Sequence, residues 1–308
     1  ADALGSLTVS GTSVIGDAAV SAMTVTTKDA QTYEGAVTLA SNSTLASNNS
    51  GAIDFQSTLD GAFTLAVNTA GATIFGDAVG GVMGSELVSL TTDSAGTVQI
   101  NGGIVKTSDA AGMVFNEAAT LGTNTTLTAT NNGAITFAST LNGAFALTAN
   151  TGGTTTFGGA VGGVSGKQLF SLTTDAPGTT QISGGAITTA GTGNFMKFGD
   201  NVTLGAATTL TAVDGNITFD KKLDSATATA RRFFLETGAG DITLTGKVGD
   251  DHALENVVVT EANKVTVSET FEATGFYQDA GAGLTRFDGA VTLSGAFEFT
   301  GQDLTINA

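Results

Sequence analysis

The chain has 308 residues, of which 43 are Gly and 1 is Pro, and it has no Cys and no Trp. Its 28 acidic residues against 11 basic ones give a net charge of -17, which argues against nucleic acid and anionic lipid as partners. The lack of Cys excludes disulfides and Cys-based zinc or redox sites, and no stretch approaches the roughly 20 apolar residues of a membrane helix.

The predicted elements are short strands, each followed by a turn that contains Gly or Asp. Thr, Val and Gly are poor helix formers, and no segment keeps a 3.6-residue apolar stripe, so no helix is expected. One aromatic or aliphatic residue marks each strand, about 20 residues after the last. In chain order these residues are Tyr33, Phe55, Phe75, Ile100, Phe115, Phe137, Phe157, Ile182, Phe198 and Phe219.

A longer repeat, with a period of about 82 residues, lies over this short one. The run GAIDFQSTLDGAFTL from Gly51 is answered by GAITFASTLNGAFAL from Gly133, and LVSLTTDSAGTVQINGG from Leu87 by LFSLTTDAPGTTQISGG from Leu169. Fainter copies place the module starts near residues 6, 89, 171 and 256, with the last module truncated.

A single coil of about 20 residues cannot bury its apolar edge, but stacked coils can, with each strand hydrogen-bonded to the next coil. We therefore predict an all-β chain that forms one continuous parallel β-solenoid over residues 1–308, with about 15 coils. The predicted core stack is Tyr33, Phe55, Phe75, Phe115, Phe137, Phe157, Phe198, Phe219 and Phe287. The structural alternative is a row of antiparallel sandwich domains, with hairpin turns at steps such as Asp60-Gly61 and Asn142-Gly143.

Runs such as TYEGAVTL, NTTLTATNNGAITF and GTTTFGGAVGG resemble the β-strand repeats of giant bacterial surface proteins, similar to filamentous haemagglutinins and autotransporter passengers. The resemblance covers nearly the whole chain and is weakest over residues 221–285. It implies a right-handed parallel β-helix, an extracellular place on the bacterial cell surface, and a role in adhesion or cell contact. It offers no catalytic residue.

Groups that could carry out catalysis are scarce. His252 is the only His, so no His pair and no Ser-His-Asp triad is expected, and we predict that it is a solvated turn residue. Tailspike and pectin-lyase-like β-helices bind or cleave carbohydrate with clustered charges, and this alternative stays open. It would be favoured if Asp214, Asp220 and Asp224 converged in a groove. The charged cluster in question is Asp214, Asp220, Lys221, Lys222, Asp224, Arg231 and Arg232. A solvated insertion loop is the favoured interpretation of this cluster, and a binding protrusion is the alternative.

Calcium is the only cofactor with any support in the sequence. Gly turns carry the carboxylates of Asp214, Asp241, Asp250 and Asp251, which are the hard oxygen ligands that calcium prefers. They match no established calcium loop, and ordinary solvated turns explain them as well. No other metal or cofactor is expected.

The sequence thus predicts a non-enzymatic structural component of a secreted bacterial surface fibre or adhesin. Both ends of the sequence lie in strand-like segments with no polar cap, as in ALGSLTV and FEFTGQDLTINA. Either the coils continue in a longer array, or copies stack head to tail into filaments. The expected partners are other copies, head to tail or side by side, and cell-surface glycans or a host receptor.

Overall fold

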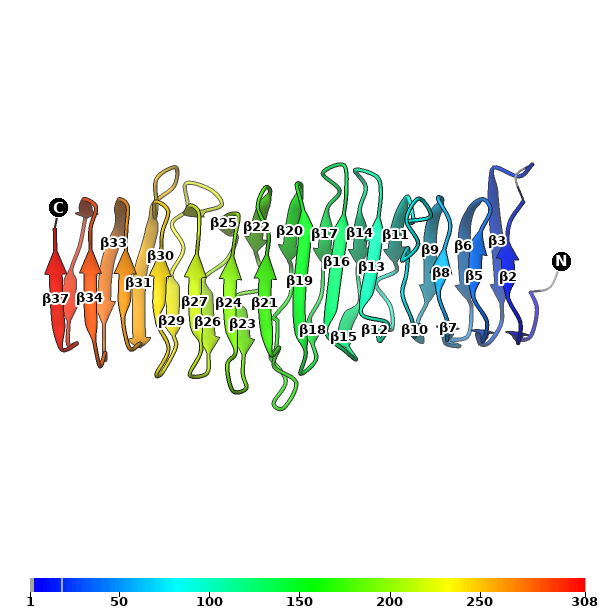
Figure 1. Cartoon of the computed structure of the whole chain (residues 1–308), viewed down its shortest axis with the longest axis horizontal. Coiled ribbons are helices and arrows are strands. Elements are labelled where there is room, and N and C mark those ends of the chain that lie inside the picture. The colour runs from blue at the N-terminus through cyan, green and yellow to red at the C-terminus, as the bar shows by residue number, and fades with distance from the viewer. Residues whose placement is uncertain (1–2, 18, 308) are drawn as a thin grey trace. The chain divides into compact units, whose positions relative to one another are not determined.

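The computed structural model describes residues 3–17 and 19–307, and these residues form β-strands joined by turns (Figure 1). No helix occurs among the described residues, so none is available there to cross a membrane. The structure divides into two compact units, Ala1–Thr154 and Thr155–Ala308, and β20 (Thr154–Phe157) contains the boundary. Each unit is a stack of coils with three faces, and all strand pairs within the units are parallel.

Faces A, B and C make up the first unit. Face A consists of β1 (Leu7–Val9), β4 (Gln31–Tyr33), β7 (Ile53–Phe55), β10 (Ala72–Phe75), β12 (Thr97–Ile100), β15 (Ala118–Leu121) and β18 (Leu141–Asn142). Face B consists of β3 (Ala22–Thr27), β6 (Asn42–Ser47), β9 (Thr64–Thr69), β11 (Ser89–Thr92), β14 (Met113–Phe115) and β17 (Ile135–Phe137). Face C consists of β2 (Ser13–Ile15), β5 (Val37–Leu39) and β8 (Leu59–Asp60), then a bridge at Val79, then β13 (Ile104–Thr107), β16 (Thr125–Ala129) and β19 (Ala146–Thr151).

Faces D, E and F make up the second unit. Face D consists of β22 (Thr179–Ile182), β25 (Asn201–Leu204) and β28 (Leu223–Ser225), a bridge at Val248, the start of β33 (Phe271–Gln278), and β35 (Val291–Leu293). Face E consists of β23 (Ala186–Thr189), β26 (Thr208–Ala212), β29 (Phe233–Glu236), β31 (Leu254–Glu261), the rest of β33, and β36 (Phe297–Phe299). Face F consists of β21 (Ser171–Thr174), β24 (Phe195–Phe198), β27 (Asn216–Phe219), β30 (Ile242–Leu244), β32 (Val265–Val267), β34 (Leu284–Phe287) and β37 (Asp303–Ile306).

The parallel stacking confirms the predicted β-solenoid and excludes the antiparallel sandwich alternative. The described residues make about 14 turns, close to the predicted number of about 15. Coil length varies on face A. Ile53 pairs with Thr73, 20 residues later, whereas Phe75 pairs with Ile100, 25 residues later, because that coil includes the long turn before β11. β11 and β21 begin at Ser89 and Ser171, where modules are predicted to start. The continuity of one solenoid over residues 1–308 stays a prediction.

The sequence module does not contain a whole number of coils. Tyr33 in β4 lies on face A, but its equivalent one module later, Phe115 in β14, lies on face B. Between them the chain returns to face A three times, at β7, β10 and β12, and then stops one face short of a fourth return. A module therefore spans more than three coils and fewer than four.

This offset divides the predicted core stack into separate ladders. Tyr33, Phe55 and Phe75 stack on face A, with ring centroids 5.3 and 5.7 Å apart. On face B, Phe115 stacks on Phe137 at 5.2 Å. In the second unit, Phe198 stacks on Phe219 at 4.8 Å on face F, whereas Phe287 packs edge-on against Phe271 and Phe276. All nine predicted core residues are buried, Phe157 included.

Neighbouring coils approach each other most closely at Gly corners. A Cβ on Gly102 would lie 1.9 Å from the backbone of Asp77 in the preceding coil, and one on its module equivalent Gly184 would lie 2.0 Å from the backbone of Gly159. No side chain fits at these corners, so the repeated NGG and SGG sequences are a requirement of the stacking itself.

Candidate functional site

The outer surface of face F in the second unit carries an exposed aromatic ring. Side chains alternate along β24, so Met196 and Phe198 enter the core while Phe195 and Lys197 point outward. Phe195 remains 37% exposed although neighbouring strands flank it. A large apolar side chain on the solvent face of a sheet contributes little to the core, and so its presence calls for another explanation.

Comparison with the preceding module shows that the inward Met and Phe of the strand are kept, whereas Phe195, Lys197 and the preceding Asn194 differ. Residues 194–198, NFMKF, align with residues 111–115, AGMVF, and the inward Met and Phe are the same in both copies. In the earlier copy a buried Gly112, in the turn before β14, stands at the position of Phe195, and Val114 stands at that of Lys197. Because the inward pattern alone specifies the strand, the outward pair does not serve the architecture.

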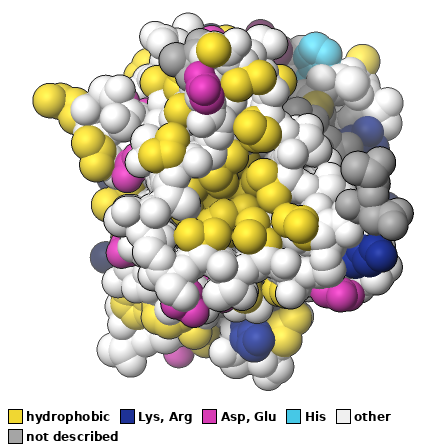
Figure 2. All heavy atoms as spheres, turned by 90° about the vertical axis from the view of Figure 1, so that its right-hand side faces the viewer, with side chains coloured by type: hydrophobic (Ala, Val, Ile, Leu, Met, Phe, Trp, Pro, Cys, Tyr) yellow, Lys and Arg dark blue, Asp and Glu magenta, His cyan; other side chains and the backbone are white. Residues whose placement is uncertain are grey.

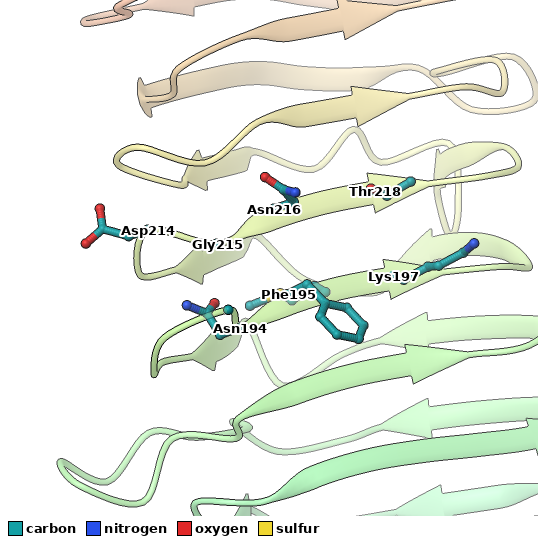
Figure 3. A pocket seen from close by; sticks show the side chains of 9 residues that line it. Asn194, Phe195, Lys197, Asp214, Gly215, Asn216 and Thr218 are labelled. Atoms are coloured by element: carbon teal, nitrogen blue, oxygen red, sulfur yellow. The ribbon is translucent and has the colours of Figure 1, made fainter.

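An open hollow of about 330 Å³ lies beside this ring (Figure 3). Strand register places Asn216 next to Phe195 and Thr218 next to Lys197 in the following coil. The Lys197 ammonium lies 3.1 Å from a carboxylate oxygen of Asp220. Asp214 projects from the turn before β27 at the rim of the hollow (Figure 3).

Several polar groups around the hollow have hydrogen-bonding capacity to spare. The Asn216 Oδ1 accepts from the Asp241 backbone N–H at 2.8 Å, and Asp214 Oδ1 accepts from the Ala239 N–H at 3.2 Å. The Asn216 amide nitrogen and the Thr218 hydroxyl donate to no group in the part of the chain that the structure describes. The hollow therefore offers donors, an acceptor and an apolar ring together.

A buried amide fixes the turn that borders the hollow. Asn194 is only 3% exposed; its Nδ2 donates to the carbonyl oxygens of Gly191, at 2.8 Å, and Val213. Its Oδ1 accepts from the Thr189 hydroxyl at 2.9 Å. A Cβ on Gly215 would lie 2.1 Å from that Oδ1, so the next coil needs Gly there. These bonds hold Phe195 and Asp214 on a rigid frame.

The carboxylates predicted to signal a carbohydrate-cleaving groove do not converge. Asp214 and Asp220 lie beyond opposite ends of β27, about 20 Å apart at the usual rise per residue. Asp224 lies in β28 on face D, where it is buried and accepts from the Asp251 N–H at 3.1 Å. The wider cluster is also divided, because Arg232 lies 2.8 Å from Glu255 at the start of face E. The adjacent Arg231 has a buried Nε for which the described part of the chain provides no partner.

Lys221 and Lys222 belong to a surface group of charges beyond the end of β27. Lys222 forms ion pairs with Asp250 and, at 3.3 Å, with Asp251, while Lys247 lies 2.8 Å from Asp250. The hydrogen bond from Lys222, with that from Lys247, lowers the pKa of Asp250. Lys221 lines a neighbouring hollow with Asp220 and Glu269. The group is an exposed network of opposite charges.

The four carboxylates predicted as calcium ligands each interact with another group of the protein. Asp214 accepts from a backbone N–H, Asp241 accepts from the Asn263 side-chain amide at 2.7 Å, and Asp250 and Asp251 pair with lysines. Over the described residues, no three His, Asp or Glu side chains gather as a metal site would require. His252 is half-buried in the loop before β31, where its carbonyl oxygen accepts from the Ser225 N–H at 3.0 Å.

Two buried carboxylates were not predicted. Glu117 is 3% exposed and accepts from the Thr92 hydroxyl, and its Oε1 has no partner among the described residues. Asp200, which is 2% exposed, accepts from Thr174 at 2.9 Å and from Thr180 at 2.8 Å. Burial raises the pKa of both carboxyls. They occupy equivalent places in successive modules, and a module alignment that tracked acidic residues would have found them.

Comparisons with protein-family models, with curated proteins and with solved structures found no match.

Proposed function

We propose that this chain is a non-enzymatic structural component of a secreted bacterial surface fibre or adhesin. The observation that carries the proposal is the mode of stacking. Each coil pairs its strands in parallel with the coils before and after it, so the fold grows along one direction by adding modules and never closes on itself. A protein built in this way is suited to extending and presenting a surface. The resemblance of its repeats to bacterial surface proteins supports the extracellular location.

The outermost described coils supply the second support. Figure 2 views the end of the first unit formed by β1 to β3, where hydrophobic side chains are open to solvent. A hollow of about 220 Å³ there is lined by core-type residues such as Leu7, Val9 and Val25. In the second unit, Leu304 and Ile306 of β37 are 39% and 49% exposed. Another coil on either edge would bury this apolar surface and satisfy the strand edges. A second copy stacked head to tail would supply such a coil.

Electron microscopy of the purified chain at rising concentration tests assembly by the second copy. We expect unbranched filaments of uniform width. Leu304→Glu places a charge on the inward side of β37 and should abolish them, whereas Thr305→Glu, on the outward side of the same strand, should not. Single particles at every concentration, or filaments that tolerate Leu304→Glu, would refute head-to-tail stacking.

The hollow beside Phe195 favours a second candidate function, carbohydrate binding. It supports binding more than cleavage, because glycosidases hold two carboxyl groups about 5 to 9.5 Å apart and Asp214 and Asp220 flank a whole strand. The two functions are compatible, since a fibre can carry a binding site on its side.

A further inference from the structure

We propose that the hollow on face F, formed by Phe195, Asn216, Thr218, Lys197 and Asp214, binds one neutral pyranose ring of a glycan. The inference rests on the proposed surface-fibre function only for the source of the ligand. The site itself is argued from the side chains that the third module places on the outside of β24 and β27.

The first step is the aromatic platform. Phe195 is 37% exposed in a coil whose Asn194, Met196 and Phe198 are fully packed, so its ring is held by a rigid strand without being covered. A pyranose presents C–H bonds on one flat side, and these carry partial positive charge that suits the negative face of an aromatic ring. Because the Phe195 side chain is held on a rigid strand, it loses little conformational entropy when a ligand binds to its ring.

The second step is the set of polar groups that line the same hollow as the ring. A pyranose has hydroxyls around its rim, each of which can donate and accept. Among the residues that the structure describes, the Asn216 amide nitrogen and the Thr218 hydroxyl donate to no group, and the Asp214 carboxylate can accept through Oδ2. An apolar surface with a few fixed polar groups is the usual composition of a small-molecule site. A hydrophobic peptide would leave these polar groups unsatisfied, so the site suits a sugar better.

The third step is charge. Lys197 is paired with Asp220 at 3.1 Å, which neutralises it, and Asp214 adds a negative charge at the rim. The whole chain carries -17 as well. An acidic sugar would therefore be repelled, and a neutral one is preferred. The hollow of about 330 Å³ is at the small end for ligand sites, which suits a single ring of a longer chain. An open site of this size implies weak binding, with a Kd on the order of 1 mM.

Saturation-transfer NMR on the intact chain tests the proposal. The probes are the methyl glycosides of glucose, galactose and mannose, with methyl glucuronide as the acidic counterpart. The variants are Phe195→Ala and Asn216→Ala. Ile104→Ala is the matched control, because Ile104 is an outward apolar residue of similar exposure, 38%, on the first unit. Thermal melting checks that each variant is folded.

We expect at least one neutral glycoside to bind, Phe195→Ala to weaken it about tenfold, and Ile104→Ala to leave it unchanged. Absence of binding to the unaltered chain, equal binding by Phe195→Ala, or stronger binding of the glucuronide would each overturn the proposal. If no sugar binds and sedimentation shows concentration-dependent association that Phe195→Ala abolishes, the ring belongs to a contact between copies and the proposal is overturned. Filaments that persist in Phe195→Ala would show that the fibre proposal survives failure of the sugar site.

Discussion

Replacing Phe55 by Ala should remove the centre of the aromatic ladder on face A. The Phe55 ring is buried between Tyr33 at 5.3 Å and Phe75 at 5.7 Å, with interplanar angles of 11° and 6°. Truncation of a buried Phe costs about 3 to 5 kcal/mol, and each aromatic pair is worth about 0.5 to 1.5 kcal/mol beyond its buried area. Because Phe55 takes part in two such pairs, we place the loss at the upper end, about 5 kcal/mol. Phe55→Leu keeps most of the volume and should cost about 2 kcal/mol.

Hydrogen exchange read by mass spectrometry is the suitable assay, because the structure has two compact units and need not unfold in one step. Protection should fall in β4, β7 and β10 and be retained in β27 and β30 of the second unit. Phe195→Ala, at an exposed ring, should change stability by less than about 0.5 kcal/mol. A loss below about 1 kcal/mol for Phe55→Ala would refute the assignment of the core to stacked rings.

Two further predictions concern pH and the turn beside the hollow. Burial raises the pKa of Glu117 and Asp200 above the ordinary values of about 4, so the folded state holds their protons more tightly than the unfolded state. The contribution of these protonated carboxyls to stability should be complete below about pH 4 and be lost as pH rises through the raised pKa values. In the double variant Glu117→Gln with Asp200→Asn, the melting temperature should fall less with rising pH than in the unaltered chain. Asp303→Asn is the control and should melt as the unaltered chain does. A pH dependence of the melting temperature that the double variant leaves unchanged would contradict the prediction. Gly215→Ala should lower the free energy of unfolding by about 1 to 3 kcal/mol, because the added Cβ would clash with Asn194. Gly5→Ala is the control, since a Cβ there meets nothing within 4 Å and should leave the free energy of unfolding unchanged. Equal free energies of unfolding for the two variants in denaturant titrations would disprove the clash.

The solenoid could be predicted from the sequence because its signals are local and repeated. An inward residue at every second position and a turn at every coil set the strand direction wherever they occur, and the ladder Tyr33, Phe55, Phe75 needed only a spacing near one coil. The division of the core into ladders on different faces could not be predicted, since it depends on the true coil length. Coils as short as the marker spacing suggests would fit four to a module, but the longer coils of the structure do not, and that difference moves Phe115 to another face.

The candidate site was harder to predict because proximity in a solenoid is set by register and not by the sequence interval. Asp214, Asp220 and Asp224 are close in sequence, yet they lie on a turn, beyond the far end of a strand and on another face. Phe195 and Asn216 are separated in the sequence by nearly a whole coil and yet lie side by side. The available signal was the departure of NFMKF from the module pattern AGMVF. It is easily missed because Phe195 precedes a core Phe and looks like part of the same apolar run.

The offset between module and coil also limits how often a site can recur. Since β4 and its module equivalent β14 lie on different faces of the first unit, copies of one outward position do not line up as a column along a single face. An outward substitution in one module, such as Phe195 with Lys197, therefore creates a single site and not a continuous stripe. If copies of the chain stack into a filament, the sites recur once per subunit, and a weak affinity for one sugar ring becomes strong attachment only when a glycan or a cell surface engages several subunits at once. Binding to a multivalent surface should then require assembly, and Leu304→Glu should abolish it while leaving the affinity for a free glycoside unchanged.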